Sequence, residues 1–147
     1  MFEIIDHDVI LKIIPQGLLC PESEIVWDKN FISNRIHIKT GGFQGEYNAE
    51  IMTFDFHKLK KDLERLYNNL NGHGYFDYLE RYLIIKIAGD GLGHFKCECE
   101  AIDQPGFEES SLKFIIHFDL TQIKTLINQL DLILTEYPIF EESKDDK

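Results

Sequence analysis

The amino-acid sequence predicts an α+β fold: an antiparallel meander sheet of roughly six to eight strands, with two amphipathic helices packed on one face. Three observations lead to this prediction. Several segments alternate apolar and polar side chains with the two-residue period of a half-buried strand. Short turns connect these segments, which is typical of antiparallel sheets rather than of βαβ units. Two longer segments repeat apolar side chains every three or four residues, which is the period of a helix.

Three predicted strands lie in the first part of the chain. Each gathers apolar side chains on one face, as Val9, Leu11 and Ile13 do in the first of them. A Thr-Gly-Gly sequence separates the second strand from the third, and glycine readily adopts the positive φ angles that tight turns need. The three strands are predicted at Asp8–Ile14, Phe31–Lys39 and Phe43–Ile51.

The segment between the first two strands, residues 18–29, is predicted as a loop. It contains Pro21, which interrupts regular structure, and the only tryptophan of the chain, Trp27. A short strand around Ile25–Trp27 is the alternative for its second half.

The second half of the chain contains four further predicted strands. The most regular of them places Phe95, Cys97 and Cys99 on one face and polar side chains on the other. A glycine-rich sequence at 89–93 precedes it and predicts a hairpin connection. The four strands are predicted at Tyr75–Glu80, Leu83–Ile87, Phe95–Ala101 and Leu112–Phe118.

Two helices are predicted from their apolar stripes and from their ends. We expect Asp55 to cap the first helix, which Asn71-Gly72 would close. We expect Asp119 to cap the second, with Gln122 completing a capping box and Pro138 ending the helix. The stripes are Leu59, Leu63, Leu66, Tyr67 and Leu70 in the first helix, and Ile123, Leu126, Ile127, Leu130, Ile133, Leu134 and Tyr137 in the second.

Length and composition predict one domain in the cytoplasm. The 147 residues fit a single domain at residues 1–140, with a flexible acidic tail at 141–147. No apolar run approaches the roughly 20 residues of a membrane-spanning helix, and the N-terminus does not resemble a signal peptide. The three cysteines form neither an even set nor a CxxC pair, which favours reduced thiols.

The charge of the chain bears on its partners. The formal net charge is −11, so the overall field repels phosphates and binding to nucleic acid is not expected. Solubility is one explanation for this charge. A basic protein partner attracted by it is the other.

No combination of residues in the sequence predicts catalysis or metal binding. The six histidines are scattered, and no HExxH or paired Cys/His spacing joins any two of them. Cys97 and Cys99 share the apolar face of one strand, where small core residues are expected. We therefore predict no catalytic residue, no metal and no cofactor, and hence no enzyme.

Two pairs of glutamates are the candidate binding residues. Glu46 and Glu50 share one face of a predicted strand, and Glu98 and Glu100 share one face of another. Carboxylates on an open, polar sheet face would be solvated rather than catalytic, because acid–base chemistry needs an enclosed site that separates their pKa values. As an acidic recognition surface they could contact a basic protein, with Trp27 as an aromatic anchor if it is exposed.

The order of elements and several short motifs resemble a known family. Phe43-x-Gly45 opens the strand before the first helix, Gly93-His94 marks a hairpin, and Phe118-Asp119 precedes a terminal helix that ends in Tyr137-Pro138. Together these features resemble the WapI-type immunity proteins of bacterial contact-dependent and polymorphic toxin systems. The resemblance implies a cytosolic, non-enzymatic protein that binds and neutralises a cognate toxin, often a nuclease. It brings no catalytic residues with it.

Two alternative functions stay open from the sequence. One is a domain that binds a small molecule, or acts on one as an enzyme, in a pocket between the sheet and the helices. The other is an interaction domain, including a homodimer formed through an edge strand. The choice between a monomer and a homodimer also stays open.

Overall fold

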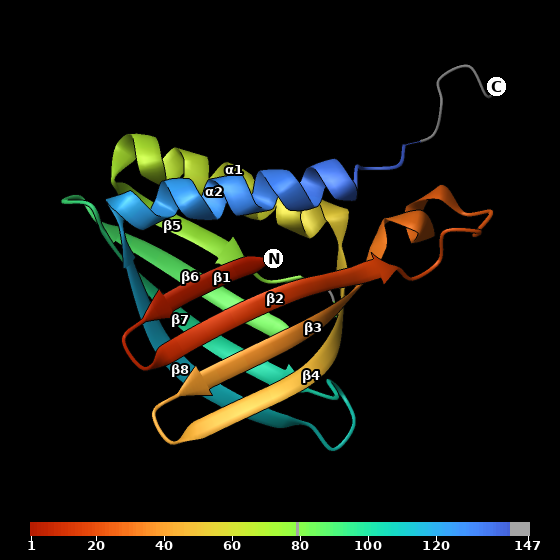
Figure 1. The fold of residues 1–147 in the computed structure, drawn as a ribbon, viewed down its shortest axis with the longest axis horizontal. Coiled ribbons are helices and arrows are strands. Elements are labelled where there is room, and N and C mark those ends of the chain that lie inside the picture. Colours follow the sequence, from red (N-terminus) through yellow and green to blue (C-terminus); the bar gives the residue numbers. More distant parts are fainter. Residues whose placement is uncertain (79, 142–147) are drawn as a thin grey trace.

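The computed structural model describes residues 1–78 and 80–141, which form two antiparallel sheets and two long helices (Figure 1). Each half of the chain makes four strands and then one helix. The first half contains β1 (Phe2–Asp6), β2 (Val9–Leu18), the short 3₁₀ helix η1 (Val26–Asn30), β3 (Phe31–Thr40), β4 (Phe43–Met52) and α1 (Thr53–Asn69). The second half contains β5 (Asn71–Phe76), β6 (Leu83–Asp90), β7 (His94–Asp103), β8 (Ser110–Asp119) and α2 (Leu120–Glu136).

The prediction of one continuous meander sheet is wrong, although the α+β class is confirmed. Strands β1 to β4 pair in sequence order in a first sheet, and β5 to β8 pair in sequence order in a second. Alternation shows which side of a strand is apolar, but it does not specify which strand lies beside it. Here α1 interrupts the meander, and β5 starts a new sheet instead of pairing with β4.

The two sheets face each other, and their strands cross in the view of Figure 1. Their inner faces are the apolar faces predicted from the sequence, and they form one core with the helices; Ile36 of β3 and Cys97 of β7 are both fully buried. The helices lie side by side along one side of this sandwich, α1 next to β5 and α2 next to β1 (Figure 1). They close that side of the core rather than cover a face of a single sheet.

Two strands and the connection between β2 and β3 differ from the sequence prediction. The first strand, β1, was not predicted, because only Phe2 and Ile4 of its five residues are buried and so short a pattern is ambiguous. Strand β5 lies earlier than Tyr75–Glu80, because its glycines hide the alternation. Gly74 lets α1 approach β5 closely, since a Cβ at this position would lie only 3.1 Å from the Cβ of Asp62 on α1. The alternative strand at Ile25–Trp27 is wrong, because η1 begins at Val26.

A carboxylate stabilises the start of each long helix, but it occupies a different position in each: N-cap in α2 and the third helical residue in α1. Asp119 caps α2 as predicted: its side chain accepts hydrogen bonds from the N–H groups of Thr121 (3.0 Å) and Gln122 (3.1 Å). Asp55 does not cap α1. The helix begins two residues earlier, and the Asp55 carboxylate accepts a hydrogen bond from the N–H of Met52, the N-cap residue, at 3.0 Å. This is the returning half of a capping box.

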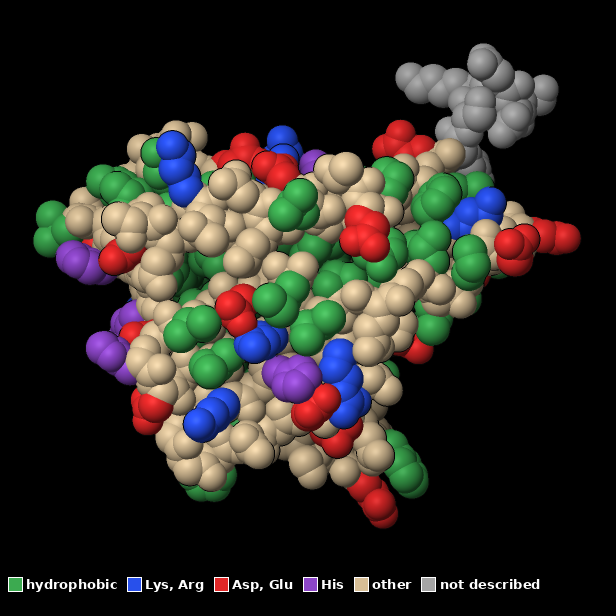
Figure 2. Space-filling model, in the orientation of Figure 1, with side chains coloured by type: hydrophobic (Ala, Val, Ile, Leu, Met, Phe, Trp, Pro, Cys, Tyr) green, Lys and Arg blue, Asp and Glu red, His purple; other side chains and the backbone are tan. Residues whose placement is uncertain are grey.

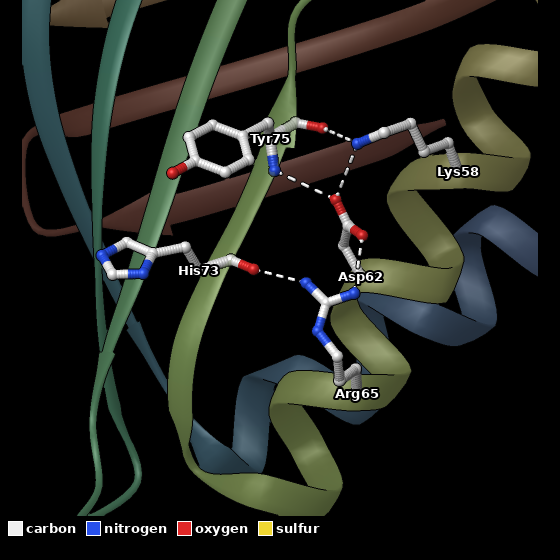
Figure 3. Close-up of polar contacts among 5 residues, drawn as sticks. All are labelled: Lys58, Asp62, Arg65, His73 and Tyr75. Atoms are coloured by element: carbon white, nitrogen blue, oxygen red, sulfur yellow. Dashed lines mark hydrogen bonds and ion pairs between the residues drawn. The ribbon is translucent and has the colours of Figure 1, made fainter.

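Asp62 of α1 attaches the helix to β5 (Figure 3). Its side chain is largely buried, and it accepts hydrogen bonds from the N–H of Tyr75, from Lys58 Nζ and from Arg65 Nη1, each at 3.0 Å. Lys58 and Arg65 in turn donate to the backbone carbonyls of Tyr75 and His73. Burial raises the pKa of Asp62, but these three donors outweigh it and hold the pKa below its usual value.

Candidate functional site

Glu46 and Glu50 lie on the outer face of the first sheet, on β4. The Glu46 carboxylate accepts a hydrogen bond from Arg35 Nε at 2.8 Å and lies 3.0 Å from His37 Nε2. The hydrogen bond from Arg35 lowers the pKa of Glu46. Part of this predicted binding surface is therefore already paired with basic side chains of β3.

Glu98 and Glu100 lie on the outer face of the second sheet, on β7. Lys86 of β6 stands opposite Glu98, and Lys113 of β8 stands opposite Glu100. Because β4 and β7 belong to different sheets of the sandwich, the structure does not bring the two glutamate pairs together. They form two separate surfaces.

The outer faces of the sheets are not where the acidic charge accumulates. Lysine and arginine side chains accompany the glutamates on both faces, and Figure 2 shows both signs of charge mixed over the first sheet. The excess of carboxylates lies instead in connections and at the ends of elements. One such group follows β2, with Glu22, Glu24 and Asp28, and another joins β7 to β8, with Asp103, Glu108 and Glu109.

Trp27, the fifth predicted residue, is exposed and lies on a segment that projects from the sandwich (Figure 1). This segment, which connects β2 to β3, places large apolar side chains at the surface: Trp27 is 58% exposed and Ile25 62%. The Trp27 ring stacks on the ring of Phe54 at the start of α1, with centroids 5.2 Å apart. We call this surface the Trp27 corner, defined by Leu19, Glu22, Glu24, Ile25, Trp27, Asp28, Phe54, Phe140 and Glu141.

The buried side chain of Asn30 holds the Trp27 corner in place. Asn30 lies at the end of η1 and is fully buried. Its amide nitrogen donates to the carbonyls of Trp27 (3.3 Å) and Phe140 (3.2 Å), and its amide oxygen accepts from the N–H of Phe140 (2.8 Å). Thr53 Oγ1 donates to the Asn30 carbonyl at 3.3 Å. These bonds connect the projecting segment to α1 and to the chain beyond α2.

A shallow, open hollow of about 270 Å³ lies beside the aromatic rings of the Trp27 corner. Trp27, Phe54 and Phe140 line it together with Glu141. Lys29 Nζ lies 6.0 Å from the centre of the Phe140 ring, so a cation already rests on one of these rings. In Figure 2 the segment projects at the right of the view, with hydrophobic side chains gathered on it and acidic side chains at its rim.

Of the residues that build the Trp27 corner, the sequence pointed to Trp27 as a candidate but not to Asn30, Phe54 or Phe140. Asn30 and Phe140 are 110 residues apart, so their contact leaves no local pattern. One feature of the sequence could have indicated this surface: Ile25 and Trp27 are large apolar residues in a segment that has neither strand nor helix periodicity.

None of the depressions on the described surface is enclosed, and the hollow of the Trp27 corner is itself open to solvent. One of about 610 Å³ lies open on the outer face of the second sheet, lined by Ile84, Ile115 and charged side chains of both signs. Between the sheets and the helices, where a small-molecule pocket was the alternative, the described side chains form one buried cluster. Within residues 1–78 and 80–141, no three His, Cys, Asp or Glu side chains are grouped so as to hold a metal ion. No helix of this part is both long and apolar enough to cross a membrane.

Comparison with known proteins finds a matching family and solved structures with a similar fold. The model of the family described as "Immunity protein WapI-like family" matches residues 1–138. Among solved structures, the plant transcriptional regulator PBF-2 is similar with a TM-score of 0.53 and 9% identity, over 92% of this chain and 80% of that one. At this identity the likeness concerns the fold alone.

Two further solved structures are more distant in shape. MRP1/MRP2 of Trypanosoma bruciei matches with a TM-score of 0.49 and 11% identity, over 87% of this chain and 74% of that one. A CdiA-CT/CdiI toxin and immunity complex from Enterobacter cloacae matches with a TM-score of 0.44 and 13% identity, over 83% of this chain and 99% of that one. The comparison with curated proteins found no match.

Proposed function

The chain belongs to the WapI-like immunity protein family, and from this membership we propose that it binds a cognate protein toxin and neutralises it. The family match over residues 1–138 is the observation that carries the proposal, because it covers both sheets and both helices. Neutralisation would come from binding, without a reaction catalysed by this chain, and would take place in the cytoplasm.

We further propose that the toxin is a basic protein and that it is a nuclease. The net charge of −11 supports a basic partner, since opposite charges accelerate association and suppress wrong partners. An enzyme that acts on nucleic acid presents basic side chains to phosphates. An acidic protein that occupies this surface would exclude the substrate.

The candidate toxin for the experiment is the C-terminal domain of the protein encoded directly upstream of the gene of this chain. The domain is expressed in bacteria alone and together with this chain, and growth is measured. Co-expression is expected to restore growth, and the purified proteins are expected to form a stable complex in titration calorimetry. A toxic neighbouring domain that neither binds this chain nor is neutralised by it would refute the proposal.

The nuclease identity has its own measurement. The purified toxin domain is incubated with RNA and with DNA, and this chain is added in increasing amounts. Degradation should stop at one equivalent. If the domain binds this chain but degrades neither nucleic acid, the immunity function stands and the nuclease proposal is wrong.

The glutamate pairs remain two separate proposals for the contact surface. Glu46 with Glu50 would place the toxin over the first sheet, and Glu98 with Glu100 would place it over the second. One toxin surface cannot lie flat on both, because the outer faces of a sandwich point away from each other. Charge reversal of each pair therefore tests one sheet at a time.

A further inference from the structure

We propose that the Trp27 corner is the surface that receives the toxin, and that its hollow accepts an arginine or lysine side chain of that toxin. This inference rests on the proposed function and specifies its site. It moves the contact away from the sheet faces, where the glutamate pairs lie, to the projecting segment between β2 and β3.

The chain connectivity makes this segment unusual within the fold. Strands β1 and β2, and likewise β3 and β4, are joined by two-residue turns, whereas the connection from β2 to β3 runs from Leu19 to Asn30. Two antiparallel strands need only a tight turn to pair, so the fold does not require a longer connection. Long connections in compact domains commonly carry binding function. Here the extra residues are ordered by the hydrogen bonds of Asn30 rather than left loose.

The apolar side chains of the Trp27 corner are exposed although the fold has a large core to bury them. Trp27 keeps 58% of its surface in contact with solvent, and its ring is held by stacking on Phe54. Tryptophan is enriched at the energetic centres of protein interfaces, and an ordered ring loses little conformational entropy when a partner binds. A preorganised, exposed tryptophan is therefore suited to binding a protein.

The charges of the Trp27 corner select a basic partner. Four carboxylates lie on it, at Glu22, Glu24, Asp28 and Glu141, and within the described residues 19–30 and 140–141 Lys29 is the one basic side chain. The outer faces of the sheets lack this excess, because their carboxylates stand beside lysine and arginine side chains.

The hollow is the part of the Trp27 corner that fits a single side chain. Aromatic rings on its walls attract a cation through their π faces, and Glu141 on its rim supplies the opposite charge. Lys29 over the Phe140 ring is an example of this contact within the chain. An arginine of the toxin would place its guanidinium plane against Trp27 and its charge toward Glu141.

The test is the affinity of variants for the toxin domain encoded beside this chain's gene, measured by titration calorimetry. Trp27→Ala should raise the Kd at least about 30-fold, which corresponds to a hot-spot loss of ~2 kcal/mol. Glu22→Lys combined with Glu24→Lys should also raise the Kd, and should reduce the dependence of affinity on salt, because attractive charges have been removed.

Matched controls separate the Trp27 corner from the rest of the surface. Phe43→Ala removes another exposed aromatic side chain, 69% exposed, at the β3–β4 turn. Glu108→Lys with Glu109→Lys reverses the same number of charges on exposed residues of the β7–β8 connection. Both controls should leave the Kd within about threefold of the parent, less than ~1 kcal/mol. Urea unfolding of every variant verifies that it is folded.

The outcomes distinguish failure of the proposed function from failure of the proposed contact surface. If the unmodified chain does not bind the toxin domain, the proposed function fails. If it binds and Trp27→Ala leaves the Kd within about threefold, the Trp27 corner is not the interface and only this inference fails. A glutamate pair whose reversal weakens binding in that case identifies the sheet face that is used instead.

Discussion

Replacing Asp62 with alanine tests how strongly one carboxylate holds α1 to β5. The substitution leaves the N–H of Tyr75 without an acceptor in a partly buried position, which costs about 1–3 kcal/mol. It also removes the partner of Lys58 and Arg65. Those side chains are 61% and 49% exposed and can turn to water, so each lost pair adds less than ~1 kcal/mol.

The expected total is a loss of about 3 kcal/mol in the free energy of unfolding, or roughly 6–12 °C in Tm for a domain of this size. Urea unfolding followed by circular dichroism measures the loss. Hydrogen exchange at the Tyr75 amide should become much faster, because this amide loses its acceptor. The control is Glu64→Ala on the same helix, whose carboxylate is 41% exposed and lies 3.7 Å from Lys60 Nζ; it should cost less than ~0.5 kcal/mol.

The pH dependence of Asp62→Asn separates charge from hydrogen bonding. An asparagine oxygen can still accept from Tyr75, so the loss at pH 7 should be smaller than for alanine. The folded-state pKa of Asp62 lies below its ordinary value of 3.8: burial raises it, but the hydrogen bonds from Tyr75, Lys58 and Arg65 outweigh burial. The carboxylate therefore contributes stability above pH 3.8 that is lost as the pH falls through the lower folded-state pKa. The gap between parent and variant should narrow below about pH 4.

Two results would refute this reasoning. One is an Asp62→Ala variant that unfolds within ~0.5 kcal/mol of the parent, which would mean that the carboxylate is dispensable. The other is a gap between the parent and Asp62→Asn that widens as the pH falls, which would mean that the pKa is raised in the folded protein.

Three further predictions concern a helix cap, a buried acid and the thiols. Asp119→Ala removes the acceptor of two N–H groups at the start of α2 and should cost about 1–2 kcal/mol in urea unfolding. Burial raises the pKa of Asp55 to about 6, so the stability that its protonated form contributes is complete below pH 3.8 and lost as the pH rises through 6. Asp55→Asn should therefore be more stable than the parent at pH 7.5, and this gain should disappear by about pH 4 in a pH series of unfolding curves. Burial also raises the pKa of Cys97, and that of Cys99 to about 12, so a thiol reagent should modify only Cys20 rapidly in the folded protein.

Much of the local structure could be predicted from the sequence, because it depends on neighbours along the chain. The Asp119 cap needs only Thr121 and Gln122, two and three residues further on, and the alternation of β7 needs only its own ten residues. The prediction failed where contacts between distant segments determine the local structure. Gly72 and Gly74 in β5 look like a loop until α1 lies against them, and Asp55 looks like a cap until Met52 is seen to end β4.

The candidate site shows the same division. Trp27 could be chosen as an anchor from the sequence, because a tryptophan outside any regular pattern has no predicted place in the core. Its stacking on Phe54 and the hydrogen bonds from Asn30 to Phe140 could not be predicted, since they join segments that only the folded chain brings together.

The residues alone predict which side of each predicted strand is apolar, where α2 begins and that the whole chain carries excess negative charge. Side-chain periodicity and capping are local properties, and net charge is a sum over residues. The folded chain was needed to show that the strands form two sheets, and hence that Glu46 and Glu98 face opposite ways. Strands pair through backbone hydrogen bonds, which every residue type except proline can make, so the side chains of a strand do not specify which strand lies beside it.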